Sequence, residues 1–321
     1  MTTPDVEEYP VSGRDSGPYA LTTGPDGALW FTLVHSARIG RLVPGQEPTS
    51  HQLAPDSSPT VICNGPDGAL WFTTYRAHRI GRITTAGQVT EFAPPTPECG
   101  PFGIAAGPDG ALWFTETAAD RIGRITTDGT VTEYPLPRPR TGASPSAFPS
   151  AIAAAGDAMW FTMNRANAIG RIGMDGRITV QELPTEAAAP VGIAVGPDGS
   201  VWFTEIAAGQ IGRRTPDGRI TEYPLPDRTA RPHAVTTDAD GTAWFTEWGA
   251  NRVGSITPDG TITLHDLPTP ASEPHGITVG PDGALWTALE TGALARIEPT
   301  TTTVGAGCPC NRASGCHVQR A

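Results

Sequence analysis

Two histidines occupy matching sequence contexts in the C-terminal third of the chain. His233 and His275 each follow a proline directly, Glu273 precedes the second of these prolines, and Glu290 lies further along the chain. Imidazole has an ordinary pKa near 6.5, so it can accept a proton from a substrate at neutral pH. Carboxylates act as acids or bases, or hold hard metal ions. These residue types indicate acid–base or metal-assisted chemistry, provided that the fold brings them together.

A repeated segment surrounds these residues and must position them. The text Gly-Pro-Asp-Gly-Ala-Leu-Trp-Phe-Thr first occurs at residues 24–32, and versions of it recur toward the C-terminus at intervals of 41, 42 or, once, 47 residues. Each copy carries one tryptophan: Trp30, Trp71, Trp113, Trp160, Trp202, Trp244 and Trp286. A fixed period of roughly 40–45 residues, rich in glycine turns and short apolar runs, is typical of radial repeat proteins.

One repeat unit contains four short strand patterns joined by tight turns. In the unit that opens at Pro190, these patterns cover residues 191–195, 200–206, 210–213 and 219–225, and two of the turns read Pro-Asp-Gly. Glycine in such turns supplies the positive φ that a hairpin requires. No helical period interrupts the pattern, and four antiparallel strands per unit are what a propeller blade requires.

The number of units predicts the fold class. Units open at Pro18, Pro59, Pro101, Pro149, Pro190, Pro232 and Pro274, but the seventh ends without a clear fourth strand. Residues 6–11 resemble the fourth strand of the fifth unit, so we expect them to complete the seventh and to close the ring. The sequence therefore predicts an all-β fold, a seven-bladed β-propeller with four-stranded antiparallel blades and an N-terminal strand that closes the last blade. Residues 1–305 would form this single domain, and residues 306–321 a disordered tail that contains cysteines.

Two positions in each unit should lie at one mouth of the central channel, because the start of the first strand and the end of the antiparallel second strand share an edge. The residue after the opening proline reads Tyr19, Thr60, Phe102, Ser150, Val191, His233 and His275. Four places after the tryptophan, the second position reads Val34, Tyr75, Thr117, Asn164, Ile206, Trp248 and Glu290. Units 6, 7 and 1 are neighbours in a closed ring, so the polar and aromatic side chains that they carry should converge. Such a local departure from a repeat is expected at a functional site.

Each of these residues also has a structural interpretation. A single histidine at a channel mouth is more often a hydrogen-bonded structural residue, whereas two at equivalent positions of neighbouring units, beside two carboxylates, favour function. The glutamates of the recurring Trp-Phe-Thr-Glu text, Glu116, Glu205 and Glu247, are interpreted as scaffold, as are the arginines of the repeated Ile-Gly-Arg. The seven periodic tryptophans should lie in the core, but Trp248 is outside the series and could stack on a ligand.

Composition excludes several classes of partner. The formal net charge of −11 and the isoelectric point near 5.0 argue against nucleic acid or an anionic membrane as a partner. No run approaches the ~20 apolar residues of a membrane span, and the acidic N-terminal text is unlike a signal peptide. We therefore expect a cytoplasmic protein, monomeric because its ring is closed. Cys308, Cys310 and Cys316 match no standard zinc spacing.

The sequence motifs that contain the mouth residues resemble those of the virginiamycin B lyase family, the seven-bladed streptogramin B lyases. The similarity lies in Gly-Pro-Tyr19, in Arg231-Pro-His-Ala, in residues 244–251, and in Glu273-Pro-His-Gly followed by Glu290. It extends over about residues 5–298. Many propellers share the repeat text, but the mouth motifs in this order are far more specific. Three departures leave the proposed catalytic positions untouched: Thr287 in place of the usual phenylalanine, an insertion at 138–148, and the cysteine-containing tail after Ala306.

This resemblance implies a lyase that linearises type B streptogramins, which are cyclic depsipeptide antibiotics, by Mg²⁺-dependent elimination at the threonyl ester C–O bond. It implies His275 as the general base, Glu273 and Glu290 as Mg²⁺ ligands, and His233 as a substrate contact. Tyr19 and Trp248 would shape the pocket. The residue types suit this chemistry, because a carbon acid is too weak for histidine alone and Mg²⁺ can stabilise developing negative charge through oxygen ligands.

Two other functions use the same mouth. A metal-dependent esterase or lactonase could act there on another cyclic ester, although it would usually have more acidic and asparagine ligands than Asn64 and Asn164 provide. A non-catalytic propeller could instead bind a peptide or a partner protein across the mouth. No Gly-x-Ser-x-Gly text occurs and no cysteine lies at the predicted mouth, which disfavours a covalent hydrolase.

Overall fold

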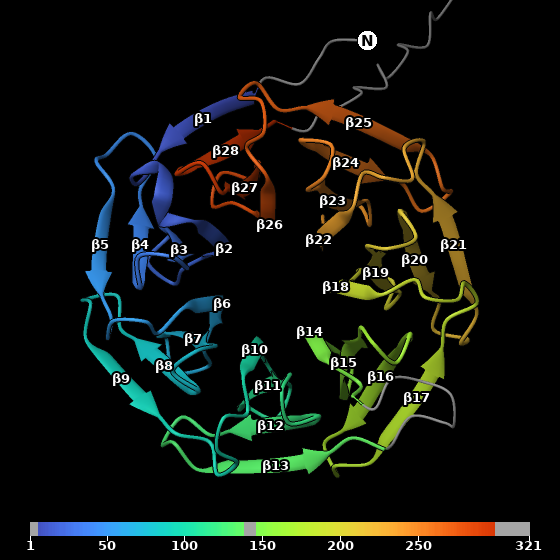
Figure 1. The fold of residues 1–321 in the computed structure, drawn as a ribbon, viewed down its shortest axis with the longest axis horizontal. Coiled ribbons are helices and arrows are strands. Elements are labelled where there is room, and N and C mark those ends of the chain that lie inside the picture. The colour runs from blue at the N-terminus through green and yellow to red at the C-terminus, as the bar shows by residue number, and fades with distance from the viewer. Residues whose placement is uncertain (1–5, 138–145, 299–321) are drawn as a thin grey trace, which may run out of the picture.

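The computed structural model describes residues 6–137 and 146–298, which form seven four-stranded antiparallel sheets arranged in a ring (Figure 1). Each sheet is one blade, and its first strand lies nearest the central axis. The predicted seven-bladed β-propeller is therefore confirmed. The predicted domain limit at residue 305 and the tail at 306–321 lie outside the described residues.

Each blade runs outward from the axis through four strands. The innermost strands are β2 (Pro18–Thr23), β6 (Pro59–Asn64), β10 (Pro101–Ala106), β14 (Pro149–Ala155), β18 (Pro190–Val195), β22 (Pro232–Thr237) and β26 (Pro274–Val279). The second strands are β3 (Leu29–Leu33), β7 (Leu70–Thr74), β11 (Leu112–Glu116), β15 (Ala158–Met163), β19 (Val201–Glu205), β23 (Ala243–Glu247) and β27 (Leu285–Leu289). The third strands are β4 (Arg38–Leu42), β8 (Arg79–Ile83), β12 (Arg121–Ile125), β16 (Ala168–Gly173), β20 (Gln210–Arg214), β24 (Arg252–Ile256) and β28 (Ala293–Ile297). The outer strands are β5 (Thr49–Gln52), β9 (Val89–Phe92), β13 (Val131–Pro135), β17 (Ile178–Glu182), β21 (Ile220–Pro224), β25 (Ile262–Asp266) and, for the seventh blade, β1 (Val6–Pro10).

The N-terminal strand closes the ring as predicted. β1 pairs antiparallel with β28 over five residues, so the seventh sheet has the order β1-β28-β27-β26. The ring of Tyr9 packs against that of Trp286 with centroids 5.0 Å apart. The carboxylate of Glu8 also accepts hydrogen bonds from the backbone nitrogen and the hydroxyl of Thr269, in the loop that leads from the sixth blade. Strand pairing, ring packing and hydrogen bonding together hold β1 in the seventh blade.

In blades 1 to 5 the repeated tryptophan of the second strand lies opposite the arginine of the Ile-Gly-Arg motif in the third strand. Trp30 is fully buried, and its indole N–H donates to Asp26 in the first hairpin turn at 3.0 Å. Arg41, from the third strand, pairs with the other oxygen of that carboxylate at 2.8 Å. A Cβ on Gly40 would lie 2.1 Å from the ring of Phe31, so only glycine fits between the two strands. These contacts confirm that the periodic tryptophans are core residues and that the repeated arginines stabilise the blade.

A β-bulge at the start of each innermost strand sets the direction of the residues at the mouth. In every blade the register shifts directly after the opening proline, as between Pro232 and Val235. The threonine of Trp-Phe-Thr donates to the carbonyl of the mouth residue in the next blade: Thr204 to His233 and Thr246 to His275, both at 2.8 Å. Bulges re-aim side chains and are frequent beside active sites. Each histidine backbone is thus fixed by its neighbouring blade.

The junction between the seventh and first blades departs from this pattern. Ala288 stands where the other blades have threonine, and it packs in an apolar cluster with Leu21 and Leu33 of the first blade. Thr287, noted above as a departure from the repeat, donates instead to the carbonyl of Gly276 in its own blade at 2.8 Å. Apolar packing therefore replaces the threonine hydrogen bond at the point where the ring closes.

None of the described residues forms a helix that is long and apolar enough to cross a membrane.

Candidate functional site

Three rings from the innermost strands of blades 1, 6 and 7 meet at the channel mouth. The ring centroid of Tyr19 (β2) lies 4.8 Å from that of His275 (β26) and 5.8 Å from that of His233 (β22). The two histidine rings are 5.1 Å apart. The Tyr19 hydroxyl lies 3.4 Å from His233 Nε2. The structure therefore brings together residues that are more than 200 positions apart in the sequence.

Glu290 lies between two histidines. Its Oε2 is 2.5 Å from Nε2 of His275, and its Oε1 is 2.6 Å from Nε2 of His35. The hydrogen bond from His275, supported by that from His35, lowers the pKa of Glu290 to about 2, although partial burial opposes this shift. Glu290 is consequently a carboxylate at every pH at which the protein would act.

His35 belongs to the site, but comparison of the repeat units did not predict it. It lies five residues after the tryptophan of blade 1, one place beyond the position compared above, where the other units read Arg76, Ala118, Arg165, Ala207, Gly249 and Thr291. Comparison of this second loop position would have found a third histidine in the three blades that form the site. The loop from the second strand thus contributes two neighbouring residues to the mouth.

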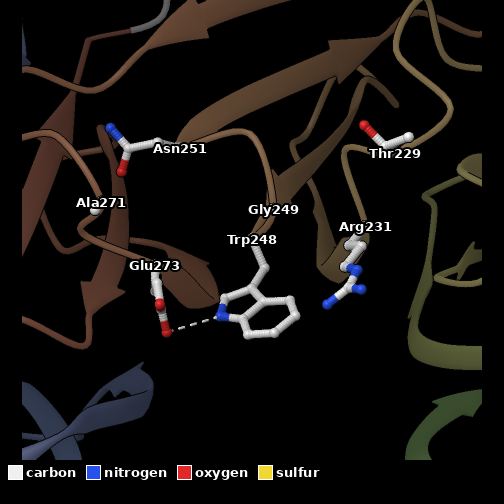
Figure 2. Close-up of a pocket in the computed structure, with 7 residues that line it drawn as sticks. All are labelled: Thr229, Arg231, Trp248, Gly249, Asn251, Ala271 and Glu273. Carbon is white, nitrogen blue, oxygen red and sulfur yellow. Dashed lines mark hydrogen bonds between the residues drawn. The ribbon is translucent and has the colours of Figure 1, made fainter.

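Trp248 contacts side chains of both blade 6 and blade 7. Its indole N–H donates to Oε2 of Glu273 at 3.1 Å, and its ring lies nearly parallel to that of His275, with centroids 6.5 Å apart. The guanidinium of Arg231 lies 5.2 Å from the Trp248 ring centroid on the side away from Glu273 (Figure 2). Trp248 is half-buried, so the ring can still contact a ligand.

Glu273 has a left-handed backbone conformation with φ of 49°. Such a conformation usually carries strain for residues with a side chain. The same conformation occurs before the opening proline in every blade, at Gly17, Ser58, Gly100, Phe148, Ala189, Arg231 and Glu273. It is therefore a feature of the repeat, and only the side chain at this position is specific to the site.

Two carboxylates and one imidazole could hold a metal ion. Ligand atoms of Glu273, His275 and Glu290 all lie within 4.8 Å of one another, the one such group of three among the described residues. Backbone hydrogen bonds from Glu290 to the carbonyls of Ser272 and Glu273, at 2.9 and 3.4 Å, hold the two loops together. Mg²⁺ prefers oxygen ligands and retains several waters, so two carboxylates on adjacent loops fit it.

Burial sets the protonation states of the other two rings. It lowers the pKa of His233 to about 3, with a further contribution from His275, so His233 is neutral at physiological pH. Burial likewise raises the pKa of the Tyr19 phenol well above its usual value, so the hydroxyl retains its proton. His233 and Tyr19 are thus neutral hydrogen-bonding groups.

The two ring nitrogens of His275 have different surroundings. Nδ1 is buried without a hydrogen-bond partner among the described residues, which leaves Nε2 as the nitrogen that faces the mouth.

Cavities flank Trp248 on both sides. One, of about 380 Å³, is lined by Arg231, Trp248 and Glu273 together with Thr229, Gly249, Asn251 and Ala271 (Figure 2). The other, of about 520 Å³, is lined by Ile206, Ala207, Arg228, Thr229, Arg231 and Trp248. A third of about 120 Å³ lies beside His35. The sequence-based candidates Tyr19, His233, Trp248, Glu273, His275 and Glu290 therefore gather at one mouth that has room for a ligand beside it.

The asparagines weighed as ligands for a lactonase are engaged elsewhere. The side-chain amide of Asn64 donates to the carbonyl of Thr23 at 2.7 Å, at the end of β6 away from the mouth. That of Asn164 donates to the carbonyl of Pro190 at 3.3 Å. Both hydrogen bonds join neighbouring blades, so these asparagines act in the scaffold.

The chain is similar in sequence to known lyases. The sequence profile of the virginiamycin B lyase family matches residues 4–297. Virginiamycin B lyase of Saccharopolyspora erythraea is 64% identical over 96 residues, which cover 30% of this chain and 32% of that protein. The chain thus matches about a third of the length of this relative. Virginiamycin B lyase of Streptomyces coelicolor is 60% identical over 42 residues, 13% of this chain and 14% of that protein.

Solved structures extend the similarity to nearly the whole chain. A streptogramin B lyase superposes with a TM-score of 0.86 at 42% identity, covering 92% of this chain and 97% of that one. A catalytically inactive histidine-to-alanine variant of virginiamycin B lyase from Staphylococcus aureus, solved with quinupristin, superposes with a TM-score of 0.87 at 38% identity. That match covers 92% of this chain and 99% of the other.

Proposed function

The chain belongs to the virginiamycin B lyase family, and from that premise we propose that it linearises type B streptogramins by elimination at the threonyl ester C–O bond. One observation carries this proposal: the imidazole of His275 lies at the mouth with Nε2 held 2.5 Å from the carboxylate of Glu290. The identity of 38–42% with structures of lyases over 92% of the chain supports it, as does the complex of an inactive histidine variant of one of them with quinupristin.

His275 Nε2 is the proposed proton acceptor, since Nδ1 of the same ring is buried. To act as a base, the neutral ring carries its one proton on Nδ1, so that Nε2 leaves Glu290 and presents a free lone pair to the Cα–H bond of the threonyl unit. The proton passes to Nε2, a double bond forms between Cα and Cβ, and the Cβ–O bond breaks. The electron pair of that bond leaves with the ester oxygen as a carboxylate. No water is added, so the product has the mass of the substrate.

His233 and Tyr19 would bind and orient the substrate. Both are neutral, His233 because burial lowers its pKa to about 3 and Tyr19 because burial raises the pKa of the phenol. Neutral donors and acceptors suit the amide groups of a cyclic depsipeptide. Trp248 offers a flat apolar face at the edge of the cavities, which suits the packing of a ring or an apolar side chain of the substrate.

Glu273 and Glu290 would hold a Mg²⁺ ion, whose ligand preference they match. When bound, such an ion supplies Lewis-acid stabilisation of the negative charge that develops on an ester or amide oxygen. We also propose that the protein acts in the cytoplasm as a monomer, with a small cyclic depsipeptide as its partner and neither nucleic acid nor membrane. The net charge of −11 supports the last two statements.

Incubation with a type B streptogramin, with Mg²⁺ and then with excess EDTA, tests this function. We expect a linear product in the presence of Mg²⁺ and intact substrate with EDTA, separated by liquid chromatography and identified by mass spectrometry. A product one water heavier would identify an esterase at the same site. Intact substrate under both conditions would refute the proposed substrate and leave ligand binding as the function of the mouth.

A further inference from the structure

Equivalent positions in blades 6 and 7 carry opposite charges. Arg231 and Glu273 each precede the opening proline of a blade, and both have left-handed backbones with φ of 52° and 49°. Their side chains lie on opposite sides of Trp248 (Figure 2). The indole N–H of Trp248 binds Glu273 at 3.1 Å, and its ring packs against the guanidinium of Arg231 at 5.2 Å. The mouth is therefore polarised, with an acidic side that includes His275 and a cationic side beyond Trp248.

Arg231 differs from most arginines that stack on tryptophan in this protein. Arg41, Arg124 and Arg213 also lie over tryptophan rings, but each forms an ion pair with an aspartate of its own blade. Arg231 forms no ion pair with a carboxylate of the described residues, and its side chain is exposed. An unpaired guanidinium at the mouth of a chain with a net charge of −11 is available to an anionic group of a ligand.

The position of Arg231 gives it access to a bound substrate from two directions. It lines the cavity of about 380 Å³ that also includes Glu273, and the cavity of about 520 Å³ on the other side of Trp248. Stacking on Trp248 restrains the guanidinium plane while its N–H edges stay free for hydrogen bonding. Arg228 lines the second cavity as well, but its guanidinium donates to the side chain of Gln210 at 3.0 Å.

We infer that Arg231 binds the carboxylate that ring opening releases, and so stabilises the leaving group of the elimination. This inference rests on the proposed function. As the Cβ–O bond breaks, one negative charge accumulates on the departing ester group, and the ground-state ester has no such charge. A guanidinium that binds this charge therefore favours the transition state over the substrate. Its planar fork matches a carboxylate in a bidentate manner.

The same polarity would set the direction in which the substrate binds. The threonyl α-carbon must face His275, and the departing ester oxygen lies only two bonds from it, so the bond that breaks is on the same side of Trp248 as the base. The acyl group behind that oxygen can extend along the edge of Trp248 toward Arg231, whose exposed side chain can meet the released carboxylate. Arg231 would thus favour the orientation in which the leaving group points toward blade 6.

Two measurements on wild type, Arg231→Met and Arg231→Lys test this role. The first is kcat and KM for a type B streptogramin with Mg²⁺; the second is binding by calorimetry of the separately prepared linear product and of its methyl ester. Arg165→Met is the matched control, because Arg165 also stacks on an aromatic ring, Phe148, at 4.5 Å, but in blade 4 across the ring. Circular dichroism would verify that each variant is folded.

We expect Arg231→Met to lower kcat by about 100-fold with a smaller change in KM, and to weaken binding of the linear product at least about 10-fold. Wild type should prefer the free acid to the methyl ester, and Arg231→Met should lose this preference. Arg231→Lys should retain part of the wild-type kcat and part of the preference for the free acid. Arg165→Met should resemble wild type in both measurements. Equal binding of acid and ester by wild type, or the same preference in Arg231→Met, would overturn the inference. Because product binding needs no turnover, it decides the role of Arg231 even if wild type left the streptogramin intact, a result that would refute the proposed function alone.

Discussion

Blades 6, 7 and 1 and blades 2 to 5 share one backbone but differ at the mouth. Every blade has the same register shift after its opening proline and a left-handed residue before it. What differs is charge and acid–base chemistry: on either side of that proline blades 6, 7 and 1 present Arg231, His233, Glu273, His275 and Tyr19. Blades 2 to 5 present no side chain there that ionises, namely Ser58, Thr60, Gly100, Phe102, Phe148, Ser150, Ala189 and Val191. The repeat therefore supplies position and orientation, and the chemistry resides in the side chains that depart from it.

Glutamates show the same contrast. Hydrogen bonds from His275 and His35 lower the pKa of Glu290 to about 2. Glu116, in the second strand of blade 3, is fully buried with neither carboxylate oxygen hydrogen-bonded to the described residues, and burial, reinforced by the nearby charge of Glu133, raises its pKa to about 8. Glu290 is thus an anion at the mouth and Glu116 a neutral acid in the scaffold at pH 7, because two histidines stabilise the charge of Glu290 and no hydrogen-bond donor among the described residues stabilises that of Glu116.

Replacement of the proposed base should have the largest effect. His275→Ala removes the proton acceptor, so we expect turnover of a type B streptogramin to fall by at least about 1,000-fold. Thermal unfolding should change little, since Thr246 bonds to the backbone carbonyl of residue 275 and not to its side chain. Val191→Ala, at the equivalent position of blade 5, should retain wild-type turnover. Substantial activity in His275→Ala would assign the base to another residue.

Replacement of Glu290 should have the second-largest effect on activity. Glu290→Gln retains the shape of the side chain but removes the anion that pairs with two histidines and would ligate Mg²⁺. We expect kcat/KM to fall by about 100-fold and the Mg²⁺ concentration for half-maximal activity to rise. Glu116→Gln, which neutralises a scaffold glutamate, is the matched control and should leave both quantities unchanged. Equal effects of the two substitutions would remove the distinction between mouth and scaffold.

A smaller effect is expected from the histidine in blade 1. His35 binds the Glu290 oxygen that His275 does not, so His35→Ala should allow that carboxylate to move. We predict an increase of about 3- to 10-fold in the Mg²⁺ concentration for half-maximal activity, with kcat at saturating Mg²⁺ nearly unchanged. Arg76→Ala, at the same loop position of blade 2, serves as the control. If His35→Ala and wild type gave the same metal titration, His35 would have no positioning role.

The smallest effect concerns stability and not activity. Below the ordinary glutamate pKa, Glu116 is protonated in both folded and unfolded chains; between that pH and about 8, only the folded chain retains the proton. This group therefore makes the free energy of unfolding decrease as the pH rises through that window. Glu116→Gln should remove about 1 kcal/mol or more of the decrease between pH 5 and pH 8, measured by chemical denaturation. The exposed Glu98→Gln should leave the slope unaltered, and an unaltered slope in Glu116→Gln would mean that Glu116 ionises normally in the fold.

The tryptophan period was sufficient to predict the blades, and the closed ring was sufficient to bring Tyr19 beside His233 and His275. Both follow from topology, because a propeller places equivalent residues of neighbouring blades side by side whatever their identity. Contacts between side chains were not predictable in this way. Which nitrogen of His275 meets Glu290 depends on rotamers, and the arrangement of Arg231 over Trp248 depends on packing between loops. His35 was not predicted, because only one position of its loop was compared between the blades.

The most direct test of the account is the isotopic composition of the product formed in water enriched in ¹⁸O. Wild-type protein with Mg²⁺ would be incubated with a type B streptogramin, and the linear product analysed by mass spectrometry. Elimination by the side chains of blades 6, 7 and 1 predicts a product with the mass of the substrate, no ¹⁸O, and a new carbon–carbon double bond in the threonyl residue. A product that gains one water and carries ¹⁸O would contradict the account, because the same mouth would then catalyse hydrolysis.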